Sequence, residues 1–210
     1  MTTIYLIRHG ECEGNRENLF RGRADVPLNE TGRNQSEELG GFLKDIFFDA
    51  VYSSPRQRAR QTASFLRSKT GNIQIENGFD NIQLGEWEGK SRDEIKAAYP
   101  DLWKIWLTSP ETLSFPGFET FEQVAARSLA ALKHILGKHS GQTIAVVSHS
   151  VVLRILIALT LEISQPYFWK LKLDNASFSI LEHRPERGFT LALLNFSGHL
   201  SHLTRWQYDG

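Results

Sequence analysis

The feature that most constrains the fold is an apolar run that leads directly into an arginine, a histidine and a glycine. Residues 4–7 read Ile-Tyr-Leu-Ile, and Arg8, His9 and Gly10 follow. A short β-branched and aromatic run that ends at a glycine is typical of a buried strand. Open α/β sheets bind their ligands at the carboxyl ends of strands, so Arg8 and His9 are candidate ligand-binding residues. Gly10 would let a ligand approach the backbone. The alternative is that Arg8 and His9 only end a strand.

The rest of the chain alternates between strand-like and helix-like segments. Strands are predicted at residues 50–52, 73–75 and 143–147, and a long amphipathic helix at 121–136. Thr31 and Ser54 are predicted to cap helices. This alternation predicts a three-layer α/β/α sandwich with a mainly parallel central sheet, in one domain over residues 1–210. Two late segments, residues 178–182 and 190–194, are predicted to be edge strands.

Residues 77–120 have a different composition, with aromatic residues spread among charges and prolines. They predict short helices and loops that form a small cap over the site. Substitution of Trp103 or Phe118 should then alter the choice of ligand. The alternative is that the aromatic residues of this segment belong to the hydrophobic core. These aromatic residues are Trp87, Trp103, Trp106, Phe115 and Phe118.

Charge and cysteine content exclude several classes of protein. Lys+Arg and Asp+Glu both number 24, so the net charge is zero. The chain therefore lacks the excess of positive charge that is typical of proteins that bind nucleic acid or an anionic membrane. The single cysteine, Cys12, cannot form an internal disulfide, which suits a reducing cytoplasm. Met1-Thr2-Thr3 leads directly into the first strand, so we expect no signal peptide. The apolar run at 151–161 contains Arg154 and is too short to span a bilayer. We therefore expect a cytoplasmic protein.

Motifs for nucleotide or metal chemistry are missing from the sequence. There is no Gly-x-x-x-x-Gly-Lys-Ser/Thr loop, and no His, Cys and Asp spacing is typical of metal ligands. His199 and His202 are three residues apart, but we assign this pair a structural role. We expect no metal and no cofactor.

Four motifs follow one another along the chain. They are Arg8-His9-Gly10-Glu11 with Asn15, SSPRQRARQTA at residues 53–63, LGEWEG at 84–89 and VVSH at 146–149. This set resembles the histidine phosphatase superfamily, in its phosphoglycerate-mutase-like branch of cofactor-independent phosphatases. One Arg-His-Gly is weak evidence, whereas four ordered motifs are specific.

The resemblance implies a role for several residues. His9 would be the nucleophile and become a phosphohistidine, and nearby arginines would keep its imidazole neutral. Arg8 and Arg58 would hold the phosphoryl oxygens with their planar forks. Arg56 and Arg60 are expected on the surface. The remaining candidates are His149, which would hold phosphate together with a helix N-terminus, and the substrate-binding residues Asn15, Arg21 and Ser150.

Three positions depart from the family pattern. Cys12 replaces a usual hydroxyl residue, and we expect it to be a small structural residue. Ser150 replaces a common glycine and would add a hydrogen-bond donor. Asn81 stands where relatives carry the general acid Glu, and an amide cannot donate a proton in that role. Asp80 could substitute, the leaving group could be a good one, or the change could be inactivating, whether natural or introduced.

The resemblance implies a metal-independent phosphatase that hydrolyses a small phosphate monoester through a phosphohistidine on His9. The alternatives are a phosphoglycerate-type mutase, a protein phosphohistidine phosphatase, and a non-catalytic phosphate-ester-binding protein, which Asn81 favours. The expected partner is a small phosphorylated metabolite, with no nucleic acid and no membrane, and the chain would be a monomer or a homodimer. Which phosphate ester is bound does not follow from the sequence.

Overall fold

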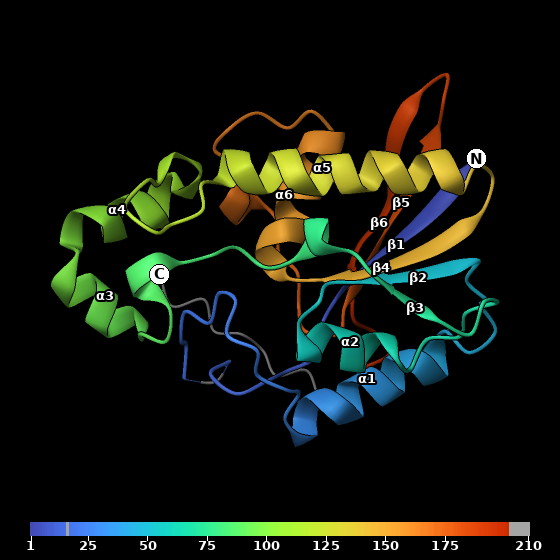
Figure 1. Cartoon of the computed structure of the whole chain (residues 1–210), viewed down its shortest axis with the longest axis horizontal. Helices are drawn as coiled ribbons and strands as arrows, with labels where there is room; N and C mark the ends of the chain where they lie inside the picture. Colours follow the sequence, from blue (N-terminus) through green and yellow to red (C-terminus); the bar gives the residue numbers. More distant parts are fainter. Residues whose placement is uncertain (16, 202–210) are drawn as a thin grey trace.

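A six-stranded sheet forms the centre of the computed structural model, which describes residues 1–15 and 17–201 (Figure 1). The strands lie in the order β3-β2-β4-β1-β5-β6. The first four are parallel, while β5 pairs antiparallel with β1 and β6 pairs antiparallel with β5. Their bounds are β1 (Thr2–Arg8), β2 (Ala50–Ser53), β3 (Ile73–Ile75), β4 (Thr143–Ser148), β5 (Phe178–Arg184) and β6 (Gly188–Phe196).

The predicted fold class is confirmed, with one correction to the sheet. The segment predicted as an edge strand at residues 178–182 is β5, which lies between β1 and β6. Only β6, of the two late strands, is at an edge. The apolar pattern of the late segments did not distinguish the two positions, because pairing partners are set by the tertiary fold.

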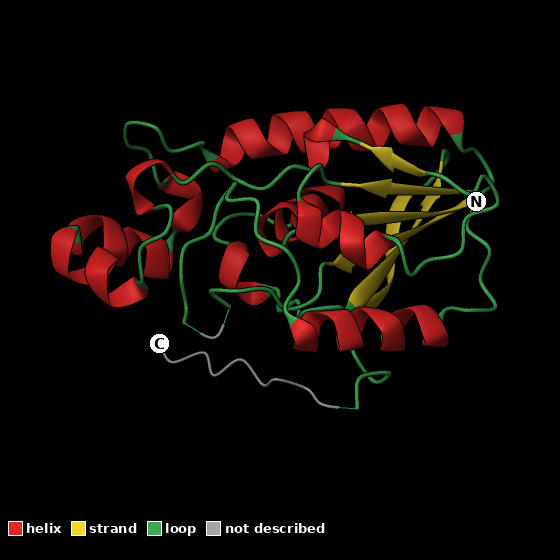
Figure 2. Cartoon of the chain, turned by 60° about the horizontal axis from the view of Figure 1, so that its bottom comes forward, coloured by secondary structure: helices red, strands yellow, loops and turns green. Residues whose placement is uncertain are grey.

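Helices cover both faces of the sheet (Figure 2). Alternate strand residues point to opposite faces. Leu6 and Val146 join the core beneath α5 and α6, whereas Ile7 and Val147 join the core beneath α1 and α2. This arrangement is the predicted three-layer sandwich. The helices are α1 (Glu30–Phe42), α2 (Gln57–Ala63), α3 (Arg92–Ala98), α4 (Pro100–Thr108), α5 (Phe121–Lys138) and α6 (Ser150–Thr160).

Two helix starts differ from the sequence-based expectation. Asn29, and not Thr31, caps α1, because its side chain accepts a hydrogen bond from the Gly32 amide. Helix α2 begins at Gln57, so Ser54 lies outside it. The Ser54 hydroxyl instead contacts a histidine, as described below.

The predicted cap consists of short elements at one end of the molecule, where α3 and α4 extend beyond the sheet (Figure 1). Its 3-10 turns are η1 (Asn77–Phe79), η2 (Gly85–Trp87) and η3 (Pro110–Thr112), and a further turn, η4 (Phe168–Lys170), follows α6. Trp87 is fully buried, with its ring 5.1 Å from that of Phe115, and Phe118 joins the same core. For these rings the core interpretation holds.

Among residues 1–15 and 17–201, no helix is both long and apolar enough to cross a membrane. His202, one of the two histidines assigned a structural role, lies outside the described residues.

Candidate active site

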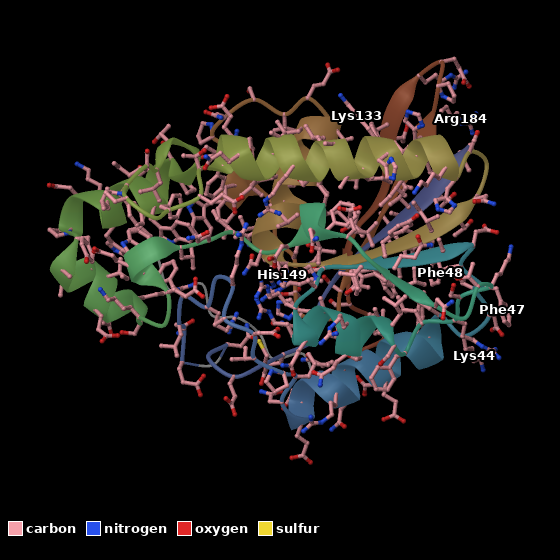
Figure 3. All side chains as sticks on the ribbon, in the orientation of Figure 1. Lys44, Phe47, Phe48, Lys133, His149 and Arg184 are labelled. Atoms are coloured by element: carbon pink, nitrogen blue, oxygen red, sulfur yellow. The ribbon has the colours of Figure 1, made fainter. Side chains whose placement is uncertain are left out.

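A cavity lies at the carboxyl ends of β1 and β4, beside the end of β2. Arg8 is the last residue of β1, and His149 follows β4. The His9 amide donates to the Ser148 carbonyl at 3.1 Å, which joins the two strand ends. Figure 3 shows His149 among closely grouped nitrogen atoms at this end of the sheet. The lining includes Arg8, His9, Arg21, Gly22, Arg58, Asn81, Arg92, Trp106, His149, Ser150, Arg154, Phe168 and Trp169.

The imidazole of His9 is held in one tautomer. Its Nδ1 lies 2.7 Å from the Gly10 carbonyl oxygen. A carbonyl can only accept, so Nδ1 carries the proton and Nε2 keeps its lone pair. Burial, and then the positive charges of Arg58 and Arg8, lower the pKa of His9 well below its usual 6.5. His9 is therefore a neutral base with a defined reactive nitrogen.

This pKa shift predicts how His9 responds to pH. Its imidazole should remain neutral as the pH falls through 6.5, the usual value. The unfolded chain would take up this proton at a higher pH than the folded chain, so the free energy of unfolding should also fall below about pH 6.5. NMR titration of the His9 ring, against the same chain in denaturant, measures the difference. A folded-state titration at or above 6.5 would contradict the neutral assignment.

Gly10 has a packing role that was not predicted. A Cβ at this position would lie 2.5 Å from the Gly32 carbonyl oxygen in α1. Glycine is therefore required for the close packing of the strand end against α1, and Gly10 is not among the cavity lining residues, so the ligand-approach explanation stays a prediction. The Gly10 amide also donates to the Thr62 hydroxyl at 3.0 Å, which ties the loop to α2.

Arg58 is fully buried and is oriented by two backbone carbonyls. Its Nη1 donates to the Ala24 oxygen at 2.6 Å and its Nη2 to the Gly22 oxygen at 2.9 Å. The Nε is buried without a hydrogen-bond partner among the described residues, so it can donate to a bound anion. Burial, joined by the charge of Arg21, lowers the pKa of Arg58 to about 10, and it stays cationic at neutral pH. Arg8, the other arginine predicted to hold phosphate, donates from its Nη1 to the Leu173 carbonyl oxygen at 2.6 Å.

Arg58→Lys should reduce kcat/KM for a phosphate ester by about 10²-fold. An ammonium group cannot replace the planar guanidinium, whose Nη groups are held by backbone carbonyls while its Nε donates to the anion. Inorganic phosphate should also inhibit the variant more weakly than the wild type. Steady-state kinetics with phosphate as a competitor measures both effects. Arg60→Lys is the matched control, because Arg60 lies on the same helix and is exposed. Equal losses in the two variants would show that the effect is not specific to the cavity.

His149 lies beside His9 and contacts Ser54. The two imidazole rings are 5.1 Å apart, edge to face. The His149 Nε2 is 2.7 Å from the Ser54 hydroxyl, and its Nδ1 is buried without a hydrogen-bond partner in the described part of the chain. Burial, followed by the charge of Arg58, lowers the pKa of His149 well below 6.5. Sequence reasoning missed Ser54, although its place directly after β2 in the second motif was an available signal.

The predicted substrate-binding residues occupy different places. Arg21 and Ser150 line the cavity. Asn15 is buried and is not among the lining residues; its Oδ1 accepts from the Cys12 amide at 2.9 Å, and its Nδ2 has no partner among the described residues. The buried Cys12 thiol also donates to this Oδ1 at 3.3 Å, as suits a small structural residue.

Asn81 lines the cavity at the position where the resemblance places an acid. Its Nδ2 donates to the Gly22 oxygen at 2.7 Å, while its Oδ1 is buried and has no partner among the residues described. An uncharged amide thus occupies the place from which a proton would have to come.

The neighbouring Asp80 is bonded to an arginine and lies outside the cavity lining. It is absent from the cavity lining, and both of its oxygens accept hydrogen bonds from Arg56. Burial alone would raise the pKa of Asp80, but the bonds to Arg56 leave it below its usual value, so the carboxylate stays ionised. Arg56 is therefore a half-buried partner of Asp80, and the surface assignment was wrong for it; Arg60 is exposed as expected.

Sequence reasoning missed part of the cavity lining. Arg154, the one charged residue in an apolar run, lies four residues after Ser150, a spacing that places both on one helix face. Trp103 and Phe118, chosen as ligand-facing cap residues, are not among the lining residues, whereas Trp106 is. Other lining residues that sequence reasoning missed include Arg92, Phe168 and Trp169.

Fold and cavity together define an α/β protein with a cavity lined by arginines and neutral histidines, groups whose chemistry suits an anion. Within residues 1–15 and 17–201, no group of three or more His, Cys, Asp or Glu residues is arranged to hold a metal ion.

Comparisons with known proteins identify the family. A model of the histidine phosphatase superfamily (branch 1) matches residues 4–197. Phosphoserine phosphatase 1 of Hydrogenobacter thermophilus is 32% identical over 201 residues, which cover 95% of both chains. The structure of YhfR from Bacillus stearothermophilus has a TM-score of 0.85 and 32% identity, covering 92% of this chain and 96% of its own. A mutant phosphoserine phosphatase from Entamoeba histolytica in complex with phosphoserine has a TM-score of 0.85 and 26% identity, covering 95% of this chain and all of its own.

The chain belongs to the histidine phosphatase superfamily. The predicted family and enzyme class, a phosphoric monoester hydrolase, are confirmed.

Proposed function

We propose that this protein hydrolyses a small phosphate monoester without a metal, through a phosphohistidine on His9. The observation that carries the proposal is the state of His9: neutral, fixed through Nδ1, and facing a cavity that it shares with Arg8 and Arg58. A neutral imidazole nitrogen is a competent nucleophile, and guanidinium groups match the oxygens of a phosphoryl group.

In the first step, the His9 Nε2 attacks phosphorus and the ester P–O bond breaks, which releases the alcohol oxygen with its electron pair. Arg8, Arg58 and His149 stabilise the negative charge on the equatorial oxygens. In the second step, water attacks the phosphorus of the phosphohistidine and the P–N bond breaks with its electron pair returning to Nε2. Neutral His9 is restored, and the inorganic phosphate leaves with the protons of the water or passes one to solvent.

The leaving oxygen needs a proton in the first step, and Asn81 cannot supply one. Solvent must then protonate an alkoxide, or the ester must carry a leaving group that is stable as an anion. A positioned acid contributes about 10²–10⁴-fold to such reactions. Slow turnover of ordinary alkyl phosphates and faster turnover of activated esters are expected.

Asn81 also supports a second candidate, a phosphate-ester-binding protein without turnover. The cavity would keep its cations and its affinity for phosphate esters, while the missing acid would prevent release of an alkoxide.

A phosphatase screen over phosphorylated metabolites and p-nitrophenyl phosphate, with EDTA present, tests the proposal. We expect release of phosphate from p-nitrophenyl phosphate that EDTA leaves unchanged. Binding of phosphate esters with no turnover of any of them would favour the second candidate.

A further inference from the structure

The Ser54 side chain is held in one place at the end of the sheet. Ser54 directly follows β2, and its amide donates to the Val147 carbonyl of β4 at 2.9 Å. Its carbonyl accepts from the Ser53 hydroxyl at 2.9 Å, and its Oγ accepts from the Arg56 amide at 3.3 Å. Ser54 is fully buried and is not among the cavity lining residues. These contacts fix the position of the Ser54 hydroxyl within the protein, away from solvent.

Only one arrangement of protons satisfies the contact between this hydroxyl and His149. The Ser54 Oγ and the His149 Nε2 are 2.7 Å apart, so one of the two atoms donates to the other. Among the described residues, the Ser54 hydroxyl has no other acceptor for its proton, because its second contact is with an amide donor. If Nε2 donated, from a neutral or a cationic ring, the hydroxyl proton would be buried without a partner, which costs free energy. Ser54 is therefore the donor, and Nε2 accepts with its lone pair.

A neutral imidazole that accepts through Nε2 carries its proton on Nδ1. The His149 Nδ1 is buried without a hydrogen-bond partner in the described part of the chain. His149 is the N-cap residue of α6, but its side chain makes no capping hydrogen bond. The ring lines the cavity, and its centroid lies 5.1 Å from that of His9. The His149 Nδ1–H is thus a donor without a protein partner, on a ring beside the proposed nucleophile.

We infer that Ser54 is a positioning residue, which holds His149 as the Nδ1–H tautomer so that this nitrogen donates to an oxygen of the phosphoryl group. The inference rests on the proposed function and assigns the source of one hydrogen bond in its first step. A donor that is already oriented when the ester binds needs no reorganisation as negative charge develops on the phosphoryl oxygens. Ser54 does not touch the substrate and acts only through His149.

A double-mutant cycle tests whether Ser54 acts through His149. In Ser54→Ala, His149 can carry its proton on either nitrogen, and kcat for p-nitrophenyl phosphate should fall about 10-fold. His149→Ala should lower kcat by about 10²-fold, and adding Ser54→Ala to it should cause no further loss. Ser54→Thr keeps a hydroxyl and should retain most of the rate. An equal loss from Ser54→Ala in both backgrounds overturns the inference.

Ser128→Ala is the matched control for the loss of a buried hydroxyl. Ser128 is fully buried in α5 and is not among the cavity lining residues. Its replacement should leave kcat unchanged, both in the wild type and in His149→Ala. If Ser128→Ala lowers kcat as much as Ser54→Ala, the loss reflects general packing and the inference is overturned.

NMR of the ring nitrogens tests the tautomer without any turnover. Long-range ¹H–¹⁵N spectra distinguish a protonated ring nitrogen from an unprotonated one. The wild type should show His149 with a protonated Nδ1, inorganic phosphate should shift this Nδ1–H signal, and Ser54→Ala should show a mixture of both tautomers. These results support the inference even if no ester is hydrolysed, in which case only the proposed function fails. A wild-type His149 that carries its proton on Nε2 overturns the inference, while hydrolysis of p-nitrophenyl phosphate would leave the proposed function standing.

Discussion

His9→Ala should abolish turnover, with kcat for p-nitrophenyl phosphate falling by at least about 10³-fold, because no other group can accept the phosphoryl group in the proposed mechanism. In the wild type, the Nδ1–H bond to the Gly10 carbonyl leaves only Nε2 to react. Rapid acid-free quenching after incubation with labelled substrate should recover an acid-labile phosphate on the wild type and none on the variant. Phosphate should still bind the variant, since Arg8, Arg58 and His149 are unchanged.

His134→Ala is the matched control for this experiment. His134 lies on α5, is exposed, and is not among the cavity lining residues. Its replacement should leave both the label and the rate at wild-type levels. Normal turnover by His9→Ala, or a label that persists on it, would show that the nucleophile has been assigned wrongly.

Asn81→Glu should raise the turnover of alkyl phosphates by up to about 10²–10⁴-fold and change p-nitrophenyl phosphate hydrolysis little. An alkoxide needs a proton as it leaves, whereas a nitrophenolate does not. The Asn81 Nδ2 now donates to the Gly22 oxygen at 2.7 Å, and a carboxylic acid would also carry a donor there, with a proton that an amide cannot transfer. Comparison of kcat/KM for glycerol 3-phosphate and p-nitrophenyl phosphate measures the effect.

Asp80→Asn provides the discriminating control. Asp80 is bound to Arg56 and does not line the cavity, so its loss should affect both substrates equally. If Asn81→Glu changes nothing and Asp80→Asn removes alkyl-phosphate turnover alone, Asp80 is the acid after all. If neither variant turns over any ester but both bind phosphate esters, the protein is a binder.

The sequence predicted the layers of the fold because hydrophobic periodicity reports which face of a strand or helix is buried. It also placed Arg8, His9 and His149 at strand ends, and parallel strands bring their carboxyl ends to one edge. The position of β5 inside the sheet was not predictable in this way, since an apolar strand suits an interior or an edge position.

Only the tertiary structure decided how side chains from distant segments meet. The Ser54 hydroxyl is hydrogen-bonded to His149, 95 positions away in the chain. Asp80 accepts hydrogen bonds from Arg56 and does not line the cavity. Arg154 was visible as a lone charge in an apolar helix, but only the packing of Phe168 and Trp169 against it shows that it belongs to the cavity. Local patterns determine which face of an element is buried, whereas a site depends on contacts between elements, and those are set by the packing of the whole chain.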